Sequence, residues 1–202
     1  MQLQMPVSAL PAGKQKLIAA ALRISARDGS SLSSLGLREL AREAGLNHNT
    51  FYRHFREPSE LVQAVAESIA AQFMVGMKEL RLRAARRGDA TRDAVEYFLD
   101  FVKANPDVFI VGVRELHSAG SPTRTVLLRV LESIARESEE QISALGLAPG
   151  VERAALLQVA LDITYYLFCH ALDLLDRPRE RKAIAAQMVQ YIRRQFLGAM
   201  AR

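Results

Sequence analysis

The feature that most constrains this 202-residue chain is the contrast between frequent helix-ending signals and nearly absent strand signals. No Asn-Gly or Asp-Gly pair separates two alternating apolar runs, as a hairpin would require; Asp28-Gly29 closes a helical pattern instead. Apolar residues recur at helical spacing between glycine and proline interruptions. Half of the chain is apolar, enough for a substantial core. The sequence therefore predicts an all-α fold.

About nine helices are expected, each ending where the periodic pattern is interrupted. We place them at about 14–28, 37–44, 48–54, 58–86, 91–104, 107–117, 123–145, 152–175 and 178–200. Gly29 is expected to end the first helix in the left-handed conformation, and Asn105-Pro106 to end the fifth.

Two short helices joined by a tight turn are expected between residues 37 and 55. Glu39 stands where its carboxylate can reach back to the amide at the start of the first of them. Gly45 supplies the positive φ that a sharp turn needs, and Asn47 can cap the second helix. This arrangement predicts a helix-turn-helix, whose second helix enters the major groove of DNA.

The charge is modest overall, with 27 Lys and Arg against 22 Asp and Glu, but it is concentrated. Residues 47–56 hold two arginines, two histidines and no acid. A second basic run at 78–92 is interpreted mainly as the solvated end of a long helix. A non-specific architectural DNA-binding protein, the alternative class, would predict a much stronger net charge and no large apolar body.

The side chains of the expected second helix are suited to base edges at its start. Asn47, His48 and Asn49 carry hydrogen-bond donors and acceptors, asparagine pairing most naturally with adenine. Asn47 is equally explained as a cap alone, and the histidines as plain surface residues. The full set expected at the DNA interface is Arg38, Asn47, His48, Asn49, Thr50, Tyr52, Arg53 and His54. We assign Phe51 and Phe55 to the core.

Other classes of function have little support in the sequence. A single cysteine, Cys169, excludes an internal disulfide and a multi-cysteine metal site. No Ser-His-Asp pattern, Gly-rich phosphate loop or metal cluster is present, so we expect neither an enzyme nor a cofactor nor a metal. Asp162 and Asp173 divide the most apolar region into runs too short for a bilayer. With no leader at the start, a cytoplasmic protein without membrane contact is expected.

Residues 14–67 resemble the N-terminal domain of the tetracycline-repressor (TetR) family. The resemblance is carried by Leu-Arg-Glu-Leu-Ala-Arg-Glu-Ala-Gly-Leu at 37–46, Thr-Phe-Tyr-Arg-His-Phe at 50–55, and Glu60-Leu61 opening a long helix. Nine helices with the last two strongly apolar extend it to nearly the whole chain. It implies a DNA-binding domain over 14–57 and a ligand-binding and dimerisation domain over 58–202. The sequence of residues 1–13 itself predicts a short disordered arm.

The resemblance also implies a function: a repressor that binds a palindromic DNA operator as a homodimer and responds to a hydrophobic small molecule. It implies that Tyr52 and His54 hold phosphates, although Tyr52 has a packing alternative. Gly36 lacks the hydroxyl that many members place at the helix cap. Glu57-Pro58 replaces a lysine that often contacts the DNA backbone, leaving Arg53 or Arg56 to substitute.

A narrower similarity concerns the branch that represses unsaturated fatty-acid synthesis genes and senses acyl thioesters. It is suggested by Leu37-Arg38-Glu39 with residues 51–56, and by Asn105-Pro106 followed by Arg114-Glu115. The alternative is a regulator of efflux or catabolic genes that responds to another hydrophobic compound.

Either effector would need an apolar pocket with a few polar groups. The residues expected to line it are Phe98, Phe101, Phe109, Val113, Arg114, Tyr165, Phe168 and Cys169. Aromatic residues at this spacing are also typical of an ordinary core. Arg114 is expected either to meet an acidic group of the ligand or to pair with a surface acid.

The last two helices are the expected dimer interface. The first has more apolar surface than one side of a helix needs, and the second carries a stripe of Ile184, Met188, Tyr191, Ile192 and Gln195. Two such helices from each chain would form a four-helix bundle. The alternative is that the first is buried within one subunit; we expect one face inward and one toward the partner.

Overall fold

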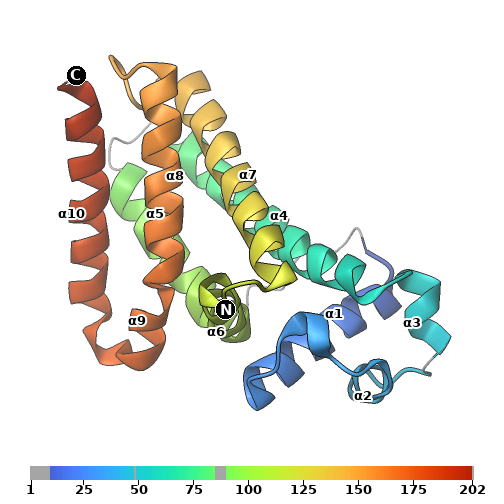
Figure 1. Cartoon of the computed structure of the whole chain (residues 1–202). Coiled ribbons are helices and arrows are strands. Elements are labelled where there is room, and N and C mark those ends of the chain that lie inside the picture. Colours follow the sequence, from blue (N-terminus) through green and yellow to red (C-terminus); the bar gives the residue numbers. More distant parts are fainter. Residues whose placement is uncertain (1–9, 48, 85–89, 202) are drawn as a thin grey trace. The chain divides into compact units, whose positions relative to one another are not determined.

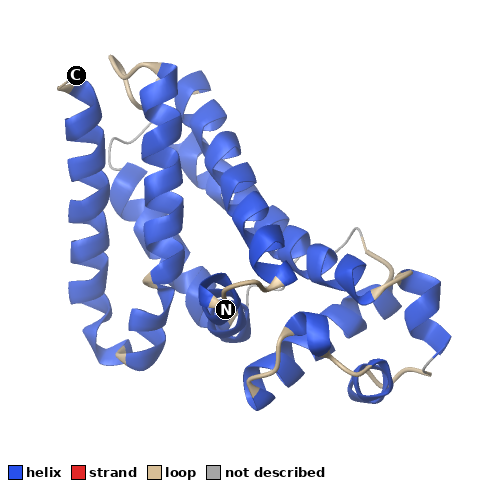
Figure 2. Cartoon of the chain, in the orientation of Figure 1, coloured by secondary structure: helices blue, strands red, loops and turns tan. Residues whose placement is uncertain are grey.

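The computed structural model describes residues 10–47, 49–84 and 90–201, and within these ranges every regular element is helical (Figure 2). The all-α prediction is confirmed. The α-helices (Figure 1) are α1 (Ala12–Asp28), α2 (Leu37–Glu43), α3 (Asn49–His54), α4 (Pro58–Ala84), α5 (Ala90–Ala104), α6 (Pro106–His117), α7 (Pro122–Ala144), α8 (Arg153–Cys169), α9 (Ala171–Asp176) and α10 (Arg181–Met200). Two short 3-10 helices, η1 (Leu32–Ser34) and η2 (Pro178–Glu180), complete the described elements. Most of the arm expected over 1–13 lies outside the described residues, and α1 begins at Ala12.

The chain divides into two compact units. Unit 1 comprises residues 1–72 and 110–130, and unit 2 comprises residues 73–109 and 131–202. Helices α4, α6 and α7 therefore contribute residues to both. The DNA-binding domain expected over 14–57 lies wholly within unit 1, and its boundary after residue 57 stays a prediction.

The core of unit 1 is built where α1 packs against α2 and α3. Leu17 and Ile24 on α1 and Leu40 on α2 are almost completely buried. Phe51 on α3 and Phe55, the residue directly after α3, are buried as well, with ring centroids 5.5 Å apart. The assignment of these two rings to the core is confirmed, and they account for the attachment of a helix too short to be stable alone.

The core of unit 2 is formed by α5, α8, α9 and α10, and α10 packs along both α5 and α8 (Figure 1). Arg181 at the start of α10 donates hydrogen bonds to Glu96 Oε2 (2.6 Å) and Asp100 Oδ1 (2.8 Å) on α5. The buried aliphatic and aromatic residues of this core include Val95, Phe98, Leu99, Val102, Phe109, Leu174, Ile184, Met188 and Ile192.

The helix expected over 152–175 is interrupted at His170, where ψ is 5°. The His170 N–H still bonds Tyr166 O at 3.0 Å, while the His170 imidazole bonds Asp173 Oδ2 at 2.8 Å at the start of α9.

By length and composition the segment Arg153–Asp176 would suffice to cross a membrane, contrary to the expectation that its runs are too short. Core helices of soluble proteins meet the same criterion, so this observation is weak evidence for a span.

Most of the stripe expected on α10 is covered by this chain itself. Ile184, Met188 and Ile192 are buried in the core of unit 2, and Tyr191 stacks on Tyr166 of α8 with ring centroids 3.7 Å apart. For Ile184, Met188 and Ile192 the interpretation as dimer interface is therefore wrong, whereas for the half-buried Tyr191 and Gln195 it stays a prediction. Periodicity showed an apolar face, but α5 and α8 of the same chain cover it.

Candidate functional site

The turn between α2 and α3 has the geometry that the sequence predicts. Gly45 adopts φ of +64°, in the left-handed region that glycine occupies without strain. Leu46 N–H donates to Ala41 O at 2.9 Å, which closes the end of α2. The side-chain oxygen of Asn47 accepts a hydrogen bond from Asn49 N–H at 3.0 Å, as expected of a residue that caps α3.

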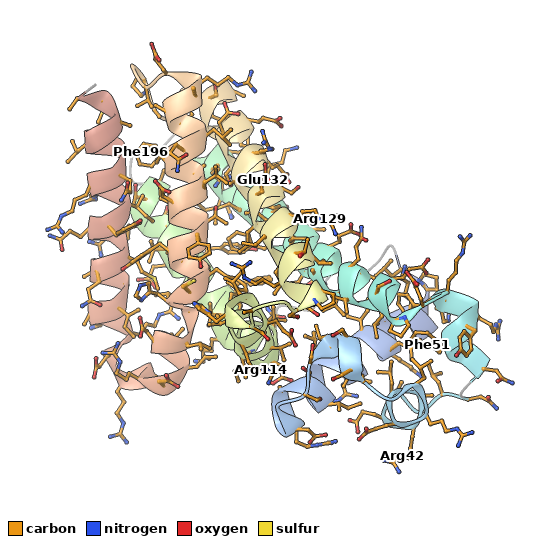
Figure 3. All side chains as sticks on the ribbon, viewed as in Figure 1. Arg42, Phe51, Arg114, Arg129, Glu132 and Phe196 are labelled. Carbon is orange, nitrogen blue, oxygen red and sulfur yellow. The ribbon has the colours of Figure 1, made fainter. Side chains whose placement is uncertain are left out.

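Helix α3 has one buried side and one solvent side. Phe51 (Figure 3) and Phe55 lie in the core, whereas Asn49 and Arg53 are exposed. Tyr52 is 58% exposed. Among the other residues expected at DNA, Arg38 and Asn47 are exposed, Thr50 and His54 are half-buried, and His48 lies outside the described residues. Their individual roles stay predictions.

Ion pairs fasten α2 to α1. Arg23 Nε lies 3.1 Å from Glu43 Oε1, and the Arg27 guanidinium approaches Glu39 (3.7 Å) and Glu43 (3.6 Å). Hydrogen bonding to Asp28 raises the pKa of Arg27 and lowers that of Asp28. These pairs are solvent-exposed, so they orient α2 more than they stabilise it.

The end of α3 is fastened to the start of α1. The His54 ring lies directly against the backbone of Gly13, and the Lys14 ammonium lies 5.0 Å from the centroid of the Phe55 ring. A cation near the face of an aromatic ring is attracted by its quadrupole. These contacts bring Lys14 next to the predicted DNA-binding helix, a position that the sequence pattern did not indicate.

Arg114, expected in the ligand pocket, has other partners in the structure. Its guanidinium donates hydrogen bonds to Ser25 O (3.0 Å), Ser25 Oγ (2.7 Å) and Ser30 O (2.7 Å), at the end of α1 (Figure 3). Val113 and Arg114 both belong to unit 1. Three N–H groups of Arg114 thus donate to oxygens of the protein itself, so Arg114 does not belong to the effector site proposed below.

Four of the expected pocket residues form one aromatic cluster in unit 2. Phe109 contacts Phe98, Phe101 and Phe168, with ring centroids 5.8, 6.3 and 5.7 Å apart. Phe98 and Phe109 are buried, whereas Phe101 and Phe168 are partly buried against the core. Packed rings of this kind fit the core interpretation as well as a ligand-lining role, which stays a prediction.

Phe73 and Tyr97 also join this cluster, although neither is among the residues expected from the sequence to line the pocket. Phe73 lies 5.3 Å from Phe101 and 6.3 Å from Phe98 between centroids, and Tyr97 donates a hydrogen bond to Phe73 O at 3.1 Å. The feature of the sequence that could have indicated a close contact here is Gly76, an isolated glycine within a helical pattern. A Cβ atom at Gly76 would overlap the Tyr97 ring.

Tyr165 and Cys169 lie one turn apart on α8. Tyr165 is 45% exposed and Cys169 is half-buried. Burial raises the pKa of the Cys169 thiol, and a hydrogen bond with Tyr165 acts in the opposite direction. Among the residues that the structure describes, no group of three or more His, Cys, Asp or Glu side chains is placed to hold a metal ion.

Comparison with known proteins supports this assignment of the elements. Residues 17–65 match the family model of bacterial regulatory proteins of the tetR family. The fatty acid degradation regulator FadR from Bacillus halodurans superposes with a TM-score of 0.74 at 14% identity, over 91% of this chain and 95% of that one. A tetR-family transcriptional regulator from Streptomyces coelicolor gives a TM-score of 0.67 at 21% identity, covering 94% and 82%. A transcriptional regulator (TerR/AcrR family) from Aquifex aeolicus VF5 gives 0.64 at 15% identity, covering 90% and 98%. The chain thus has the N-terminal helix-turn-helix domain and the all-helical fold of TetR-family transcriptional regulators.

Proposed function

We propose that this protein is a transcriptional regulator, most simply a repressor, that binds a palindromic operator in double-stranded DNA as a homodimer. The observation that carries the proposal is the division of α3 into two sides. Phe51 and Phe55 hold the helix on the core, while Asn49, Tyr52 and Arg53 stand at the surface with side chains suited to base edges and phosphates.

The dimer is proposed because one helix-turn-helix contacts too few base pairs for specificity in a genome. The outer face of α8 supports it. Only 22% of the most apolar 18-residue stretch within Arg153–Asp176 is buried inside this chain. Tyr165 is one of its large exposed residues. Leu197 and Met200 add exposed apolar surface at the end of α10. We propose that these surfaces, rather than the buried stripe of α10, meet the second copy.

The effector is proposed to be a hydrophobic small molecule that binds at the aromatic cluster around Phe109. An acyl thioester is the favoured class, supported by the sequence resemblance to lipid-gene regulators. A solved protein of the same fold is described as a fatty acid degradation regulator. The alternative is an unrelated hydrophobic effector and control of efflux or catabolic genes. An effector that prefers one conformation of the protein would change DNA affinity by population shift.

Selection from a randomised pool of duplexes tests DNA binding directly. We expect the full-length protein to enrich a palindrome whose half-site centres lie roughly 10 base pairs, or a multiple, apart. Fluorescence anisotropy on that duplex should show affinity falling steeply between 50 and 200 mM salt, as phosphate contacts require. Failure to enrich any sequence, with a monomer in solution, would overturn the proposal.

The effector class is tested on the same complex. Palmitoyl-coenzyme A, free palmitate and an aromatic hydrophobe of similar size are added separately to the protein on its selected duplex. The lipid hypothesis predicts a change in Kd of about fivefold or more with the thioester. A response to the aromatic compound alone would favour the alternative class of regulated genes.

A further inference from the structure

Two consecutive charged residues in the last turn of α6 both bind the chain that connects α1 to α2. Arg114 donates to Ser25 O, Ser25 Oγ and Ser30 O at 3.0, 2.7 and 2.7 Å. Glu115 accepts a hydrogen bond from the backbone N–H of Leu32 at 3.2 Å. All of these residues belong to unit 1, so the contacts lie within one compact body.

Arg114 acts on the end of α1. That helix ends at Asp28 and is capped by Gly29, whose φ is +71° and whose N–H donates to Ser25 O at 3.1 Å, so Arg114 gives Ser25 O a second hydrogen bond. Other carbonyl groups of a last helical turn lack partners within the helix. A cation there satisfies such oxygens and interacts favourably with the helix dipole. The Ser25 hydroxyl in turn donates to Ser30 O, so Arg114, Ser25 and Ser30 form a closed set of hydrogen bonds.

Glu115 acts on the start of η1. Its side chain is almost completely buried, at 2% exposure, and a buried carboxylate is costly unless its oxygens accept hydrogen bonds. One oxygen accepts from Leu32 N–H, and the other accepts from the Ser121 hydroxyl at 2.9 Å. The carboxylate thus joins the α1–α2 connection to the α6–α7 connection.

We propose that Arg114 and Glu115 are positioning residues that fix the path of the chain from α1 into α2. Leu32 lies only a few residues before Gly36, the N-cap of α2, and α2 itself is a short helix held to α1 partly by exposed ion pairs. Fixing residues 25–32 therefore sets the orientation of α2, and through the Gly45 turn that of α3. Only the orientation of α3 for DNA rests on the proposed DNA-binding function. The fixing of residues 25–32 by Arg114 and Glu115 concerns the protein alone.

Hydrogen–deuterium exchange on the full-length protein, without DNA or effector, tests the first step. Arg114→Ala and Arg114→Lys should each accelerate exchange in residues 29–36 by about tenfold or more, with α10 unchanged. Lysine should not rescue, because one ammonium cannot replace a guanidinium fork that reaches several oxygens. Glu115→Ala should accelerate the Leu32 amide, whereas Glu115→Gln should largely rescue it, because the amide oxygen still accepts a hydrogen bond.

His117→Ala is the matched control. It lies in the same last turn of α6, is exposed, and bonds Val113 O of its own helix at 2.8 Å. It should leave exchange in residues 29–36 as in the wild type. If Arg114→Ala unfolds the whole chain, the exchange rates of Arg114→Lys, Glu115→Ala and Glu115→Gln decide the test instead. Equal exchange in the control and in these variants would overturn the proposal.

Affinity for the duplex selected by the wild-type protein tests the second step. Arg114→Lys should weaken binding by about tenfold or more, and His117→Ala should not. Faster exchange with unchanged affinity would overturn the claim that this pair orients α3. If the wild type selects no duplex at all, the proposed function fails, while the exchange experiment still decides whether Arg114 and Glu115 hold the connection.

Discussion

The imidazole of His54, at the end of α3, packs against the backbone of Gly13 in the first turn of α1, where a Cβ atom would overlap its Nε2. The residue expected to hold a phosphate therefore also sets how α3 is attached to α1. Glycine at position 13 is required by this approach and not by any turn, because it lies inside a helix.

Gly13→Ala should displace the His54 ring. The new methyl group occupies the place of the imidazole, so His54 must rotate toward solvent, which NMR of the His54 ring protons would show. We expect weaker DNA binding in Gly13→Ala than in wild type. In a His54→Ala background the same change should instead be neutral or stabilising, by up to about 1 kcal/mol, because alanine favours helix more than glycine does. Destabilisation in both backgrounds would contradict the contact.

Substitutions on α3 should separate base readout from phosphate contact. Tyr52→Phe removes a hydroxyl expected at a phosphate, so affinity should fall about equally for all duplexes. Asn49→Ala should lose about 1–3 kcal/mol of discrimination at one base step and relax preference there. Anisotropy titrations against the selected duplex and its single-base variants distinguish the two. Identical effects of both substitutions on every duplex would count against the assignments.

Arg81 should be important for stability through its partners rather than its charge. Its guanidinium donates to Gln141 Oε1 (2.7 Å) and to the buried Ser138 Oγ (3.0 Å), and burial lowers the pKa of Arg81 to about 10. Arg81→Ala should cost about 1–3 kcal/mol in urea unfolding, since it leaves a buried hydroxyl unpaired. Arg81→Met leaves the same hydroxyl unpaired but should cost less than Arg81→Ala, because its side chain fills the space and buries no charge.

Arg136→Ala is the control for that experiment. Arg136 pairs with Glu132 at 2.6 Å in an exposed i,i+4 arrangement on α7, and such pairs contribute about 0.5 kcal/mol or less. A loss for Arg136→Ala equal to that for Arg81→Ala would show that burial at Arg81 is unimportant.

Asp173 should make stability fall in acid. Burial alone would raise the pKa of this carboxyl, but hydrogen bonds from His170 and Arg177 hold it below its ordinary value. A lowered pKa gives stability that is present above about pH 4 and is lost as pH falls through the lower folded-state value. Asp173→Asn should therefore cost up to about 1 kcal/mol at pH 7, after allowance for solvent screening, and progressively less below pH 4. The exposed Asp176→Asn is the control, and a pH-independent difference would refute the interpretation.

Tyr165→Arg should convert the dimer into monomers. A charged side chain in the centre of an apolar interface would be desolvated without a partner, so we expect a rise of about 100-fold or more in the dimer Kd by analytical ultracentrifugation. Leu82→Arg alters a residue of similar exposure on α4, 48% against 45%, and should leave the dimer intact. An unchanged dimer in Tyr165→Arg would place the interface elsewhere.

Helix boundaries could be predicted closely because glycine and proline determine them locally. The turn at Gly45 and the cap at Asn47 follow from residues that lie next to each other in the chain. The break at His170 could not be predicted this way, because neither glycine nor proline is present there. A hydrogen bond from His170 to Asp173 accompanies the break, and the helical pattern does not reveal this bond.

The misassigned residues share a different cause. A helical stripe such as that of Ile184 and Met188 shows that some surface must cover it, but not whether that surface belongs to the same chain. Arg114 presented the same problem, since its partner Ser25 lies 89 positions earlier in the sequence. Contacts over such separations depend on tertiary packing, and single-sequence periodicity carries no information about them.

Cys169, the chain's single cysteine, gives this molecule a built-in attachment point for a spectroscopic reporter. Because its thiol is half-buried and its pKa is raised, labelling at neutral pH should be slow, and mildly alkaline conditions should bring it to one reporter per polypeptide. In a symmetric dimer, the distance between the two reporters would measure the separation of the two copies of Cys169 across the twofold axis, without any engineered mutation.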